Sequence, residues 1–187
     1  MIDCCIIGGG IIGLSIAREL AGRGAGVRVL ARGGLQDTAS WAGVGIFPPA
    51  PDYPGCPPNA ALTAWSDRLH RRWADELRAE TGIDNGLRPC GGVGRPRQCG
   101  GLHLATDAAG LERLRLAARD WAARGAECHE LDAAALADRE PALADAVRRA
   151  AVLGGLLLPQ EQSFRSPWHL RALEASCWLR AATITRG

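Results

Sequence analysis

The sequence has few aromatic residues and no long apolar segment. Aromatic residues make up 5% of the 187 residues, whereas glycine is abundant, a composition typical of a soluble, helix-rich α/β protein. The longest apolar stretch near the start is interrupted by glycines and is too short to span a bilayer. No basic segment or cleavage site of small residues precedes it, so we expect a cytoplasmic protein without a membrane anchor.

An excess of charge of one sign is also missing. The 22 basic and 20 acidic residues are scattered along the chain and leave a net charge of +2, which argues against binding to nucleic acid or to an anionic membrane. The cysteines form no C-x-x-C pair, so neither a zinc site nor a disulfide framework is predicted. Most of the seven are expected to be buried as small hydrophobic residues: Cys4, Cys5, Cys56, Cys90, Cys99, Cys128 and Cys177.

The first thirty residues have the pattern of a βαβ unit. Residues 3–7 predict a buried strand and residues 11–21 a helix, followed by a second apolar strand at residues 27–30. Two parallel strands joined by a helix make a right-handed crossover in nearly all proteins. The start of the chain therefore predicts a parallel sheet with at least one helix packed on it.

A glycine cluster occupies the turn between the first strand and the helix. Gly8, Gly10 and Gly13 have the spacing G-x-G-x-x-G. The first glycine permits the tight turn, the second lets a pyrophosphate approach the backbone, and the third lets the helix pack close to the strand. The amides near Ile11 and Ile12, at the positive end of the helix dipole, would then face the anion. The cluster predicts dinucleotide binding.

The second half of this pattern departs from the rule. An Asp or Glu normally ends the second strand and accepts hydrogen bonds from the adenosine ribose, but this sequence has Ala31 there. Arg32 follows, and an Arg near this point can accommodate a 2′-phosphate. A phosphorylated nicotinamide cofactor therefore stays open as an alternative.

The rest of the chain alternates helical and strand patterns after a loop rich in Gly and Pro at residues 33–58. Asn59, Asp107 and Ser166, the last followed by Pro167, are expected to begin helices. Helices are predicted at residues 60–81, 107–124, 132–139 and 166–177, and strands at residues 102–105, 128–131 and 152–158. The apolar face expected for the first of these helices consists of Leu62, Trp65, Leu69, Trp73 and Leu77.

No metal site is predicted from the histidines. His103, His129 and His169 lie far apart in the sequence without the spacing of metal ligands, so we interpret them as surface or packing residues. Residues 89–94 and 98–103 share a Cys-Gly-Gly core. Two such units are too few for a repeat architecture, so a local duplication in a longer loop is the simpler interpretation.

The loop TASWAGVGIFPPA, residues 38–50, resembles the one that follows the βαβ unit in FAD-dependent amine and amino-acid oxidases of the D-amino-acid oxidase superfamily. Among these it is most similar to the glycine oxidases of thiamine biosynthesis. Further similar segments are TGIDNG at 81–86, CGGLHLATD at 99–107, LDAAALADREPAL at 131–143 and SFRSPWHLRAL at 163–173. The resemblance extends to about Cys177, after which WLRAATITRG departs from the expected continuation, and the chain has about half the family's length.

The resemblance implies an α/β fold that is incomplete. It consists of a Rossmann-type FAD-binding βαβ core and part of a second, antiparallel-sheet substrate domain. Residues 1–84 would form the N-terminal part of the FAD-binding domain with a connecting helix. Residues 85–148 would belong to the substrate domain, and residues 149–187 would return toward the FAD-binding domain.

The resemblance also implies which residues contact FAD. The turn at Gly8–Gly13 would surround the pyrophosphate, Ala31 and Arg32 would lie beside the adenosine ribose, and the following loop would lead to the flavin ring. The cofactor-binding residues predicted in this way are Gly8, Gly9, Gly10, Ile11, Ile12, Gly13, Ala31, Arg32, Ala39, Ser40, Val44, Gly45 and Ile46.

In proteins of this family a hydride passes from the carbon beside the substrate amine to the flavin, and oxygen then reoxidises the flavin. The implied substrate is a small amino acid or amine, and a homo-oligomer or a complementing C-terminal half is the implied protein partner. No general acid or base is visible in the sequence, so the catalytic residues are not assigned. A non-catalytic flavoprotein fragment and an NADP-binding reductase remain the alternatives.

Overall fold

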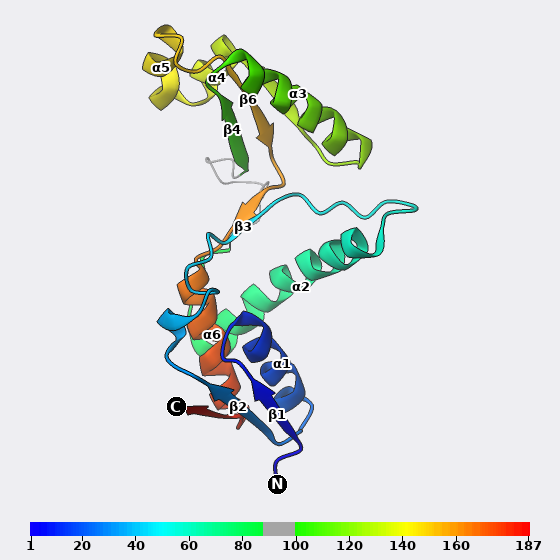
Figure 1. The fold of residues 1–187 in the computed structure, drawn as a ribbon, viewed down its shortest axis with the longest axis vertical. Helices are drawn as coiled ribbons and strands as arrows, with labels where there is room; N and C mark the ends of the chain where they lie inside the picture. Colours follow the sequence, from blue (N-terminus) through cyan, green and yellow to red (C-terminus); the bar gives the residue numbers. More distant parts are fainter. Residues whose placement is uncertain (88–99) are drawn as a thin grey trace. The chain divides into compact units, whose positions relative to one another are not determined.

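A computed structural model describes residues 1–87 and 100–187 (Figure 1). The repeated Cys-Gly-Gly motif lies largely outside these residues, as do Cys90 and Cys99. The chain divides into two compact units. The first comprises Met1–Ile46, Leu69–Leu87 and Ser163–Gly187, and the second comprises Phe47–Arg68 and Arg88–Gln162. No helix in the described part of the chain is long and apolar enough to cross a membrane.

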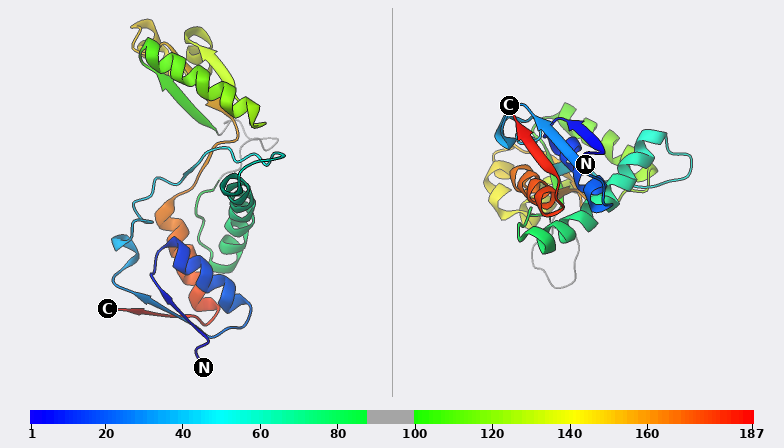
Figure 2. Two further views of the ribbon diagram at one scale, coloured as in Figure 1. Left: turned by 45° about the vertical axis from the view of Figure 1, so that its right-hand side comes forward. Right: turned by 90° about the horizontal axis from the view of Figure 1, so that it is seen from below.

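The first unit is built on a parallel sheet of three strands in the order β1-β2-β8 (Figure 2). These strands are β1 (Cys4–Ile7), β2 (Val27–Ala31) and β8 (Thr183–Arg186). Helix α1 (Ile11–Gly22) connects the first two, as the βαβ pattern predicted, and α6 (Ser166–Leu179) leads into the third. The two helices pack against each other over the sheet.

The segment after Cys177 forms the third strand of the sheet. The sequence resemblance was expected to end at about Cys177, but Thr183–Arg186 pairs in parallel register with Arg28–Ala31 of β2. The β-branched residues of this segment favour a strand, and Ile184 packs against the core of the unit. The sheet is therefore extended at the β2 edge by residues that the sequence pattern did not assign.

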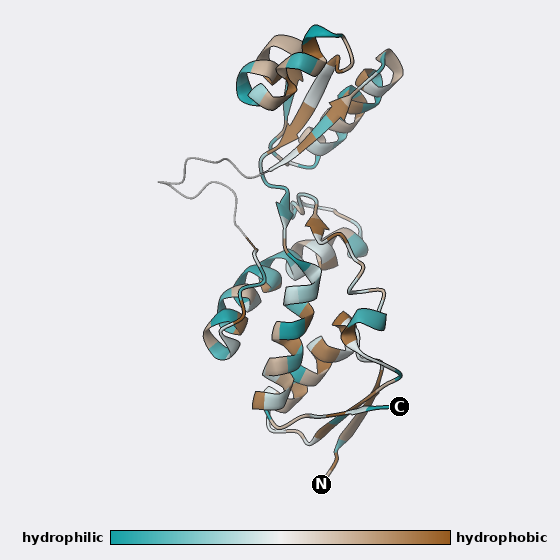
Figure 3. Cartoon of the chain, turned by 90° about the vertical axis from the view of Figure 1, so that its left-hand side faces the viewer, coloured by the Kyte–Doolittle hydropathy of each residue, from teal (hydrophilic) through white to brown (hydrophobic). Residues whose placement is uncertain are grey.

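The core of the first unit lies on one face of this sheet. Val27 and Val29 of β2 are buried, whereas Leu30 between them and the strand end is 39% exposed, because successive side chains of a strand point to opposite faces. Leu14 of α1 and Leu173 of α6 fill the covered face and are fully buried. Figure 3 shows the hydrophobic colour of β1 next to the N-terminus.

The second unit contains the predicted antiparallel sheet, in the order β4-β6-β5. All five residues of the central strand are buried, and Leu156 and Leu158 pack against Ala118 of the covering helix. Its strands are β4 (Gly101–Ala105), β5 (His129–Asp132) and β6 (Gly154–Leu158), and its helices are α3 (Ala108–Ala123), α4 (Ala133–Arg139) and α5 (Ala144–Arg148). A short 3₁₀ turn lies at Pro141–Leu143 in this unit, and another lies at Leu35–Asp37 in the first unit. The short strands β3 (Ile46–Phe47) and β7 (Gln162–Ser163) pair with each other.

Two of the expected helix starts are wrong. Helix α2 (Pro58–Thr81) begins one residue before Asn59, because proline is well suited to the first turn of a helix. Ser166 is already helical, and Arg165 precedes α6 without a side-chain cap. The prediction for Asp107 is confirmed, since its side chain accepts a hydrogen bond from the Gly110 amide at the start of α3.

The burial expected for several residues also needs correction. Of the five described cysteines only Cys177 is buried. Cys5 is exposed because it alternates with inward residues on β1 and points to the face that its own unit leaves uncovered. On α2, Leu77 is buried as expected, but Leu62 and Trp65 are 61% and 56% exposed, and Ala64 is the buried residue on that turn.

Candidate functional site

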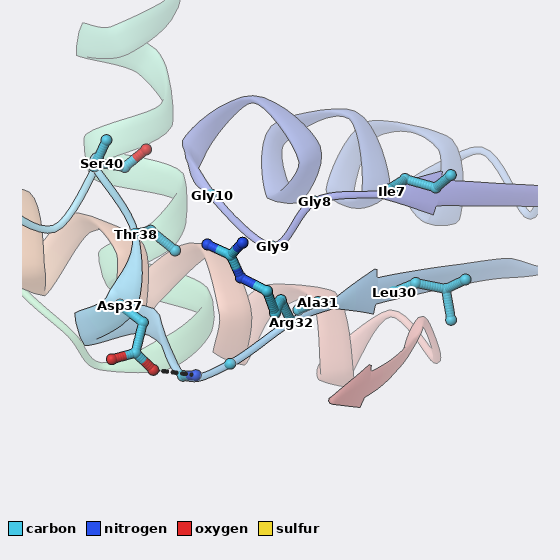
Figure 4. Close-up of a pocket in the computed structure, with 13 residues that line it drawn as sticks. Ile7, Gly8, Gly9, Gly10, Leu30, Ala31, Arg32, Asp37, Thr38 and Ser40 are labelled. Carbon is cyan, nitrogen blue, oxygen red and sulfur yellow. Dashed lines mark hydrogen bonds between the residues drawn. The ribbon is translucent and has the colours of Figure 1, made fainter. Parts of the chain in front are cut away.

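A pocket of about 530 Å³ opens at the carboxyl ends of β1 and β2, beside the first turn of α1 (Figure 4). Ligands of open α/β sheets bind at this edge, outside the carboxyl ends of the strands. The residues that line the pocket are Ile7, Gly8, Gly9, Gly10, Leu30, Ala31, Arg32, Gly33, Gly34, Asp37, Thr38, Ala39 and Ser40.

The glycine turn has the geometry that its spacing predicts. Gly8 has φ +115, a conformation that residues with a side chain rarely adopt, and its amide donates to the Leu30 carbonyl at 2.8 Å. A Cβ atom on Gly13 would lie 1.9 Å from the Gly8 carbonyl oxygen. The first glycine therefore permits the turn, and the third permits the contact between the helix and the turn.

The middle of the turn faces the wall of the pocket. A Cβ atom on Gly9 would lie 2.8 Å from Cβ of Ala31, and one on Gly10 would lie 3.1 Å from Oγ of Ser40. A side chain at either position would fill space between the turn and the opposite wall. Glycine at both positions keeps the backbone of the turn accessible from the pocket.

Ser40 has a structural contact that the sequence did not show. Its Oγ accepts a hydrogen bond from the Ile11 amide at 3.1 Å, so one of the unpaired amides at the start of α1 is already satisfied. Gly10, which precedes the helix, has no side chain for this role. The two residues are 29 positions apart, which is why local capping patterns could not predict the bond.

Two charged side chains line the pocket, one of each sign. Asp37 belongs to the 3₁₀ turn and accepts a hydrogen bond from the Gly34 amide at 2.8 Å. Arg32 follows the end of β2, and Figure 4 shows its side chain extending toward the glycine turn. Ala31, the last residue of β2, also lines the pocket and contributes only a methyl group.

The predicted cofactor-binding residues fall into two groups. Seven of them line the pocket, namely Gly8, Gly9, Gly10, Ala31, Arg32, Ala39 and Ser40. The other six do not, namely Ile11, Ile12, Gly13, Val44, Gly45 and Ile46. The prediction omitted six lining residues that lie within two positions of the assigned ones, namely Ile7, Leu30, Gly33, Gly34, Asp37 and Thr38.

The segment Val44–Ile46 lies beside the start of α6. The Gly45 carbonyl accepts a hydrogen bond from the Phe164 amide at 2.9 Å, and a Cβ atom on Gly45 would lie 2.3 Å from the Phe164 carbonyl oxygen. Val44 is 79% exposed and Ile46 is 55% exposed. Within the first unit, this segment therefore presents apolar side chains to solvent outside the pocket.

A buried ion-pair network fixes the helix that begins at the pocket. Arg18 of α1 is 1% exposed; its guanidinium donates to Ser176 at 3.0 Å and to Glu76 at 3.0 Å. Glu80 accepts from Arg180 at 2.7 Å and from Ser176 at 2.7 Å. Burial alone would raise the pKa of Glu80, but these hydrogen bonds hold it below its usual value. The network joins α1, α6 and the second half of α2.

A second buried polar residue packs near the start of α6. His169 is 1% exposed, its Nδ1 contacts the Asn85 amide nitrogen at 2.9 Å, and its ring lies 4.7 Å from that of Phe164. Burial lowers the pKa of His169 to about 4, with the charge of His70 as a further cause. The ring is therefore neutral at physiological pH, which agrees with a packing role.

The chain is similar in sequence to known flavoproteins. The family model "FAD dependent oxidoreductase" matches residues 3–186, so the likeness extends past Cys177, contrary to the expectation from the sequence. Over 91 residues the chain is 42% identical to the bifunctional protein ThiO/ThiG of Nostoc sp., an alignment that covers 48% of this chain and 14% of that protein. Over 79 residues it is 40% identical to the glycine oxidase of Pseudomonas aeruginosa, covering 42% and 22% respectively.

Solved structures show the same fold. The glycine oxidase of Geobacillus kaustophilus superposes with a TM-score of 0.81 and 28% identity over 98% of this chain. The glycine oxidase of Bacillus cereus superposes with a TM-score of 0.82 and 24% identity over the whole chain. In both cases the chain spans 46% of the length of the other protein. Because the family match extends over nearly all of its residues, the chain belongs to the family of FAD-dependent oxidoreductases.

Proposed function

We propose that the pocket between the glycine turn and the end of β2 binds the adenosine diphosphate part of FAD. The observation that supports this most directly is the turn itself, in which Gly9 and Gly10 leave the backbone accessible at the start of α1. Amides at the start of a helix favour an anion. Membership of an FAD-dependent family supports FAD over the nicotinamide cofactor that Arg32 left open.

The residues of the pocket fit the phosphate part of FAD. The turn has no side chains that would block a pyrophosphate, and Arg32 provides a positive charge at the same pocket. Ser40 leaves its hydroxyl hydrogen available, because its oxygen acts as the acceptor for Ile11. The fit is incomplete at the ribose, where Ala31 offers no hydrogen-bonding group.

We propose that the protein to which this chain corresponds oxidises a small amino acid or amine. The names of the relatives, glycine oxidases among them, support this substrate class. FAD, when bound, supplies the acceptor for the hydride that leaves the carbon beside the amine. The charged residues that line the described pocket are Arg32 and Asp37, and one carboxylate oxygen of Asp37 accepts a hydrogen bond from the Gly34 amide. This chain's contribution at the pocket is therefore to bind and orient the cofactor.

The test is the visible absorption spectrum of the purified chain after incubation with FAD and removal of the excess. We expect flavin absorption bands, and heating should release a compound with the mass of FAD. The variant G10V, whose side chain would collide with the region of Ser40, should be colourless with an unchanged circular dichroism spectrum. A folded, colourless wild-type chain would refute the binding proposal.

The substrate proposal has a separate readout. Glycine and other small amines are added anaerobically to the FAD-loaded chain, alone and together with the C-terminal half of a related glycine oxidase. Loss of the oxidised flavin absorption in either sample supports amine oxidation. If the chain binds FAD but no amine reduces the flavin in either sample, the proposal of FAD binding stands and the proposal of amine oxidation is refuted.

A further inference from the structure

We propose that Arg32 anchors the adenosine diphosphate part of the cofactor through its phosphates, and that this site does not recognise the ribose 2′-hydroxyl. This inference rests on the proposed binding of FAD to the pocket. It assigns to one arginine the role of fixing the adenosine end, which an acidic residue fulfils in most folds of this kind. Three observations on the pocket support it.

The first observation concerns the end of β2. The usual ribose acceptor is a carboxylate at this strand end, and here Ala31 occupies it. Ala31 directly faces the turn, since a Cβ atom on Gly9 would lie 2.8 Å from its own Cβ. A methyl group at this point can exclude water from the turn, but it cannot accept a hydrogen bond from a ribose hydroxyl.

The second observation concerns the other carboxylate. Asp37 is the acidic residue among those that line the described pocket, so it is the natural substitute for the missing acceptor. Its Oδ2 already accepts from the Gly34 amide at 2.8 Å and lies 2.7 Å from the position that a Cβ atom on Gly33 would take. The Gly34 amide thus fixes the Asp37 side chain against its own turn, Leu35–Asp37, through one of its two carboxylate oxygens.

The third observation concerns Arg32 itself. The structure gives it no ion pair and no side-chain hydrogen bond with any residue in 1–87 or 100–187. Five other arginines of its unit pair with carboxylates, namely Arg18, Arg23, Arg72, Arg180 and Arg186. Its side chain is exposed, lines the pocket and extends toward the glycine turn (Figure 4). A guanidinium group binds phosphate oxygens through paired hydrogen bonds.

Together, these observations indicate that the pocket recognises the phosphate charges of the nucleotide and not the 2′-hydroxyl of its ribose. The glycine turn and Arg32 approach the same part of the pocket, so a pyrophosphate there would meet backbone amides on one side and a guanidinium on the other. The ribose would lie beside Ala31, whose side chain offers no acceptor for its 2′-hydroxyl. Affinity should therefore depend on the phosphates and on ionic strength, and it should be insensitive to removal of the 2′-hydroxyl.

The experiment is isothermal titration of the full chain with ADP, 2′-deoxy-ADP and 2′-phosphorylated ADP, alongside FAD. We expect the wild type to bind ADP and 2′-deoxy-ADP equally. R32A should weaken both by about tenfold or more, the loss typical of a charge-assisted hydrogen bond. The control R28A removes the same charge from an exposed position of β2, outside the pocket, and should bind like the wild type. A31E should bind ADP more tightly than 2′-deoxy-ADP.

Each contrary result has a distinct meaning. Weaker binding of 2′-deoxy-ADP by the wild type would show a ribose acceptor, with Asp37 the first candidate, and would overturn the inference. Tighter binding of 2′-phosphorylated ADP than of ADP would assign Arg32 to a 2′-phosphate instead. If R32A binds FAD and ADP like R28A, the inference fails while the proposed function stands. If no nucleotide binds to any folded variant, both fail.

Discussion

Replacing Gly13 by alanine tests the geometry on which the site depends. Gly13 is the third residue of α1, and a Cβ atom there would lie 1.9 Å from the Gly8 carbonyl oxygen and 3.3 Å from the Ile6 side chain. Because the nearest atom belongs to the backbone of the turn, it cannot rotate away as a flexible side chain would. The variant G13A must therefore displace the turn that faces the pocket.

The change in the free energy of unfolding of G13A is the sum of two opposing contributions. Alanine is favoured over glycine inside a helix by about 1 kcal/mol, whereas overpacking of a rigid site costs about 1 to 3 kcal/mol and sometimes more. The contact at 1.9 Å belongs to the severe cases, so the free energy of unfolding should fall by about 2 kcal/mol overall. Displacement of the turn should also weaken FAD binding by about tenfold or more, which corresponds to about 1.4 kcal/mol.

The matched control is the same substitution in the same helical position of α3. Gly110 is the third residue of that helix, and a Cβ atom there would meet its nearest neighbour, a side-chain oxygen of Asp107, at 3.2 Å. G110A should therefore be as stable as the wild type or more stable by up to about 1 kcal/mol. Urea unfolding followed by circular dichroism gives both stabilities, and flavin absorbance gives FAD binding. If G13A matched G110A in stability and still bound FAD normally, the argument from the glycine turn would be wrong.

Three further predictions concern buried groups. Burial lowers the pKa of His169 from 6.5 to about 4, so the unfolded chain binds a proton at this residue more readily than the folded chain. The contribution of His169 to stability should be complete above about pH 6.5, and the free energy of unfolding should fall by about 3 kcal/mol as the pH drops to about 4. In urea unfolding measured across that pH range, H169Q should show a smaller decrease. The variant R18M leaves Glu80 without one of its two arginine partners and should lower the free energy of unfolding by about 2 kcal/mol. A midpoint of thermal unfolding equal to that of the wild type would contradict this prediction. Burial raises the pKa of the Cys177 thiol to about 12, so an alkylating reagent should modify the exposed Cys5 before Cys177. Peptide mass spectrometry would measure the two rates of alkylation, and equal rates would contradict the buried position of Cys177.

Local patterns were sufficient wherever a short segment contains all the information that its structure needs. The βαβ unit, the Asp107 cap and the strands of the antiparallel sheet were predicted because apolar periodicity and capping act over a few neighbouring residues. The tight turn between β1 and α1 was predictable for the same reason, because the spacing of three nearby glycines indicates it. The exact helix starts at Pro58 and Ser166 were not, since adjacent residues compete for the capping position.

Features that join distant segments required the tertiary structure. The hydrogen bond from Ile11 to Ser40 spans 29 positions, and the one from Arg18 to Ser176 spans 158. The pairing of β8 with β2 also joins residues from opposite ends of the chain. None of these partners can be identified from local composition, because many residues of the same type are available.

The sequence by itself determined that a glycine turn follows the first strand, that the usual ribose carboxylate is replaced by Ala31, and that an arginine comes next. The burial that it predicted for this strand is wrong, since the strand alternates half-buried and exposed residues. Only the tertiary structure decided that Arg32 lines the pocket unpaired among the described residues, that Asp37 is engaged by its own turn, and that the Val44–Ile46 segment lies outside it. The physical reason is that turns and strands are selected by interactions between near neighbours. The direction and the partners of a side chain depend on which distant segments the core brings beside it.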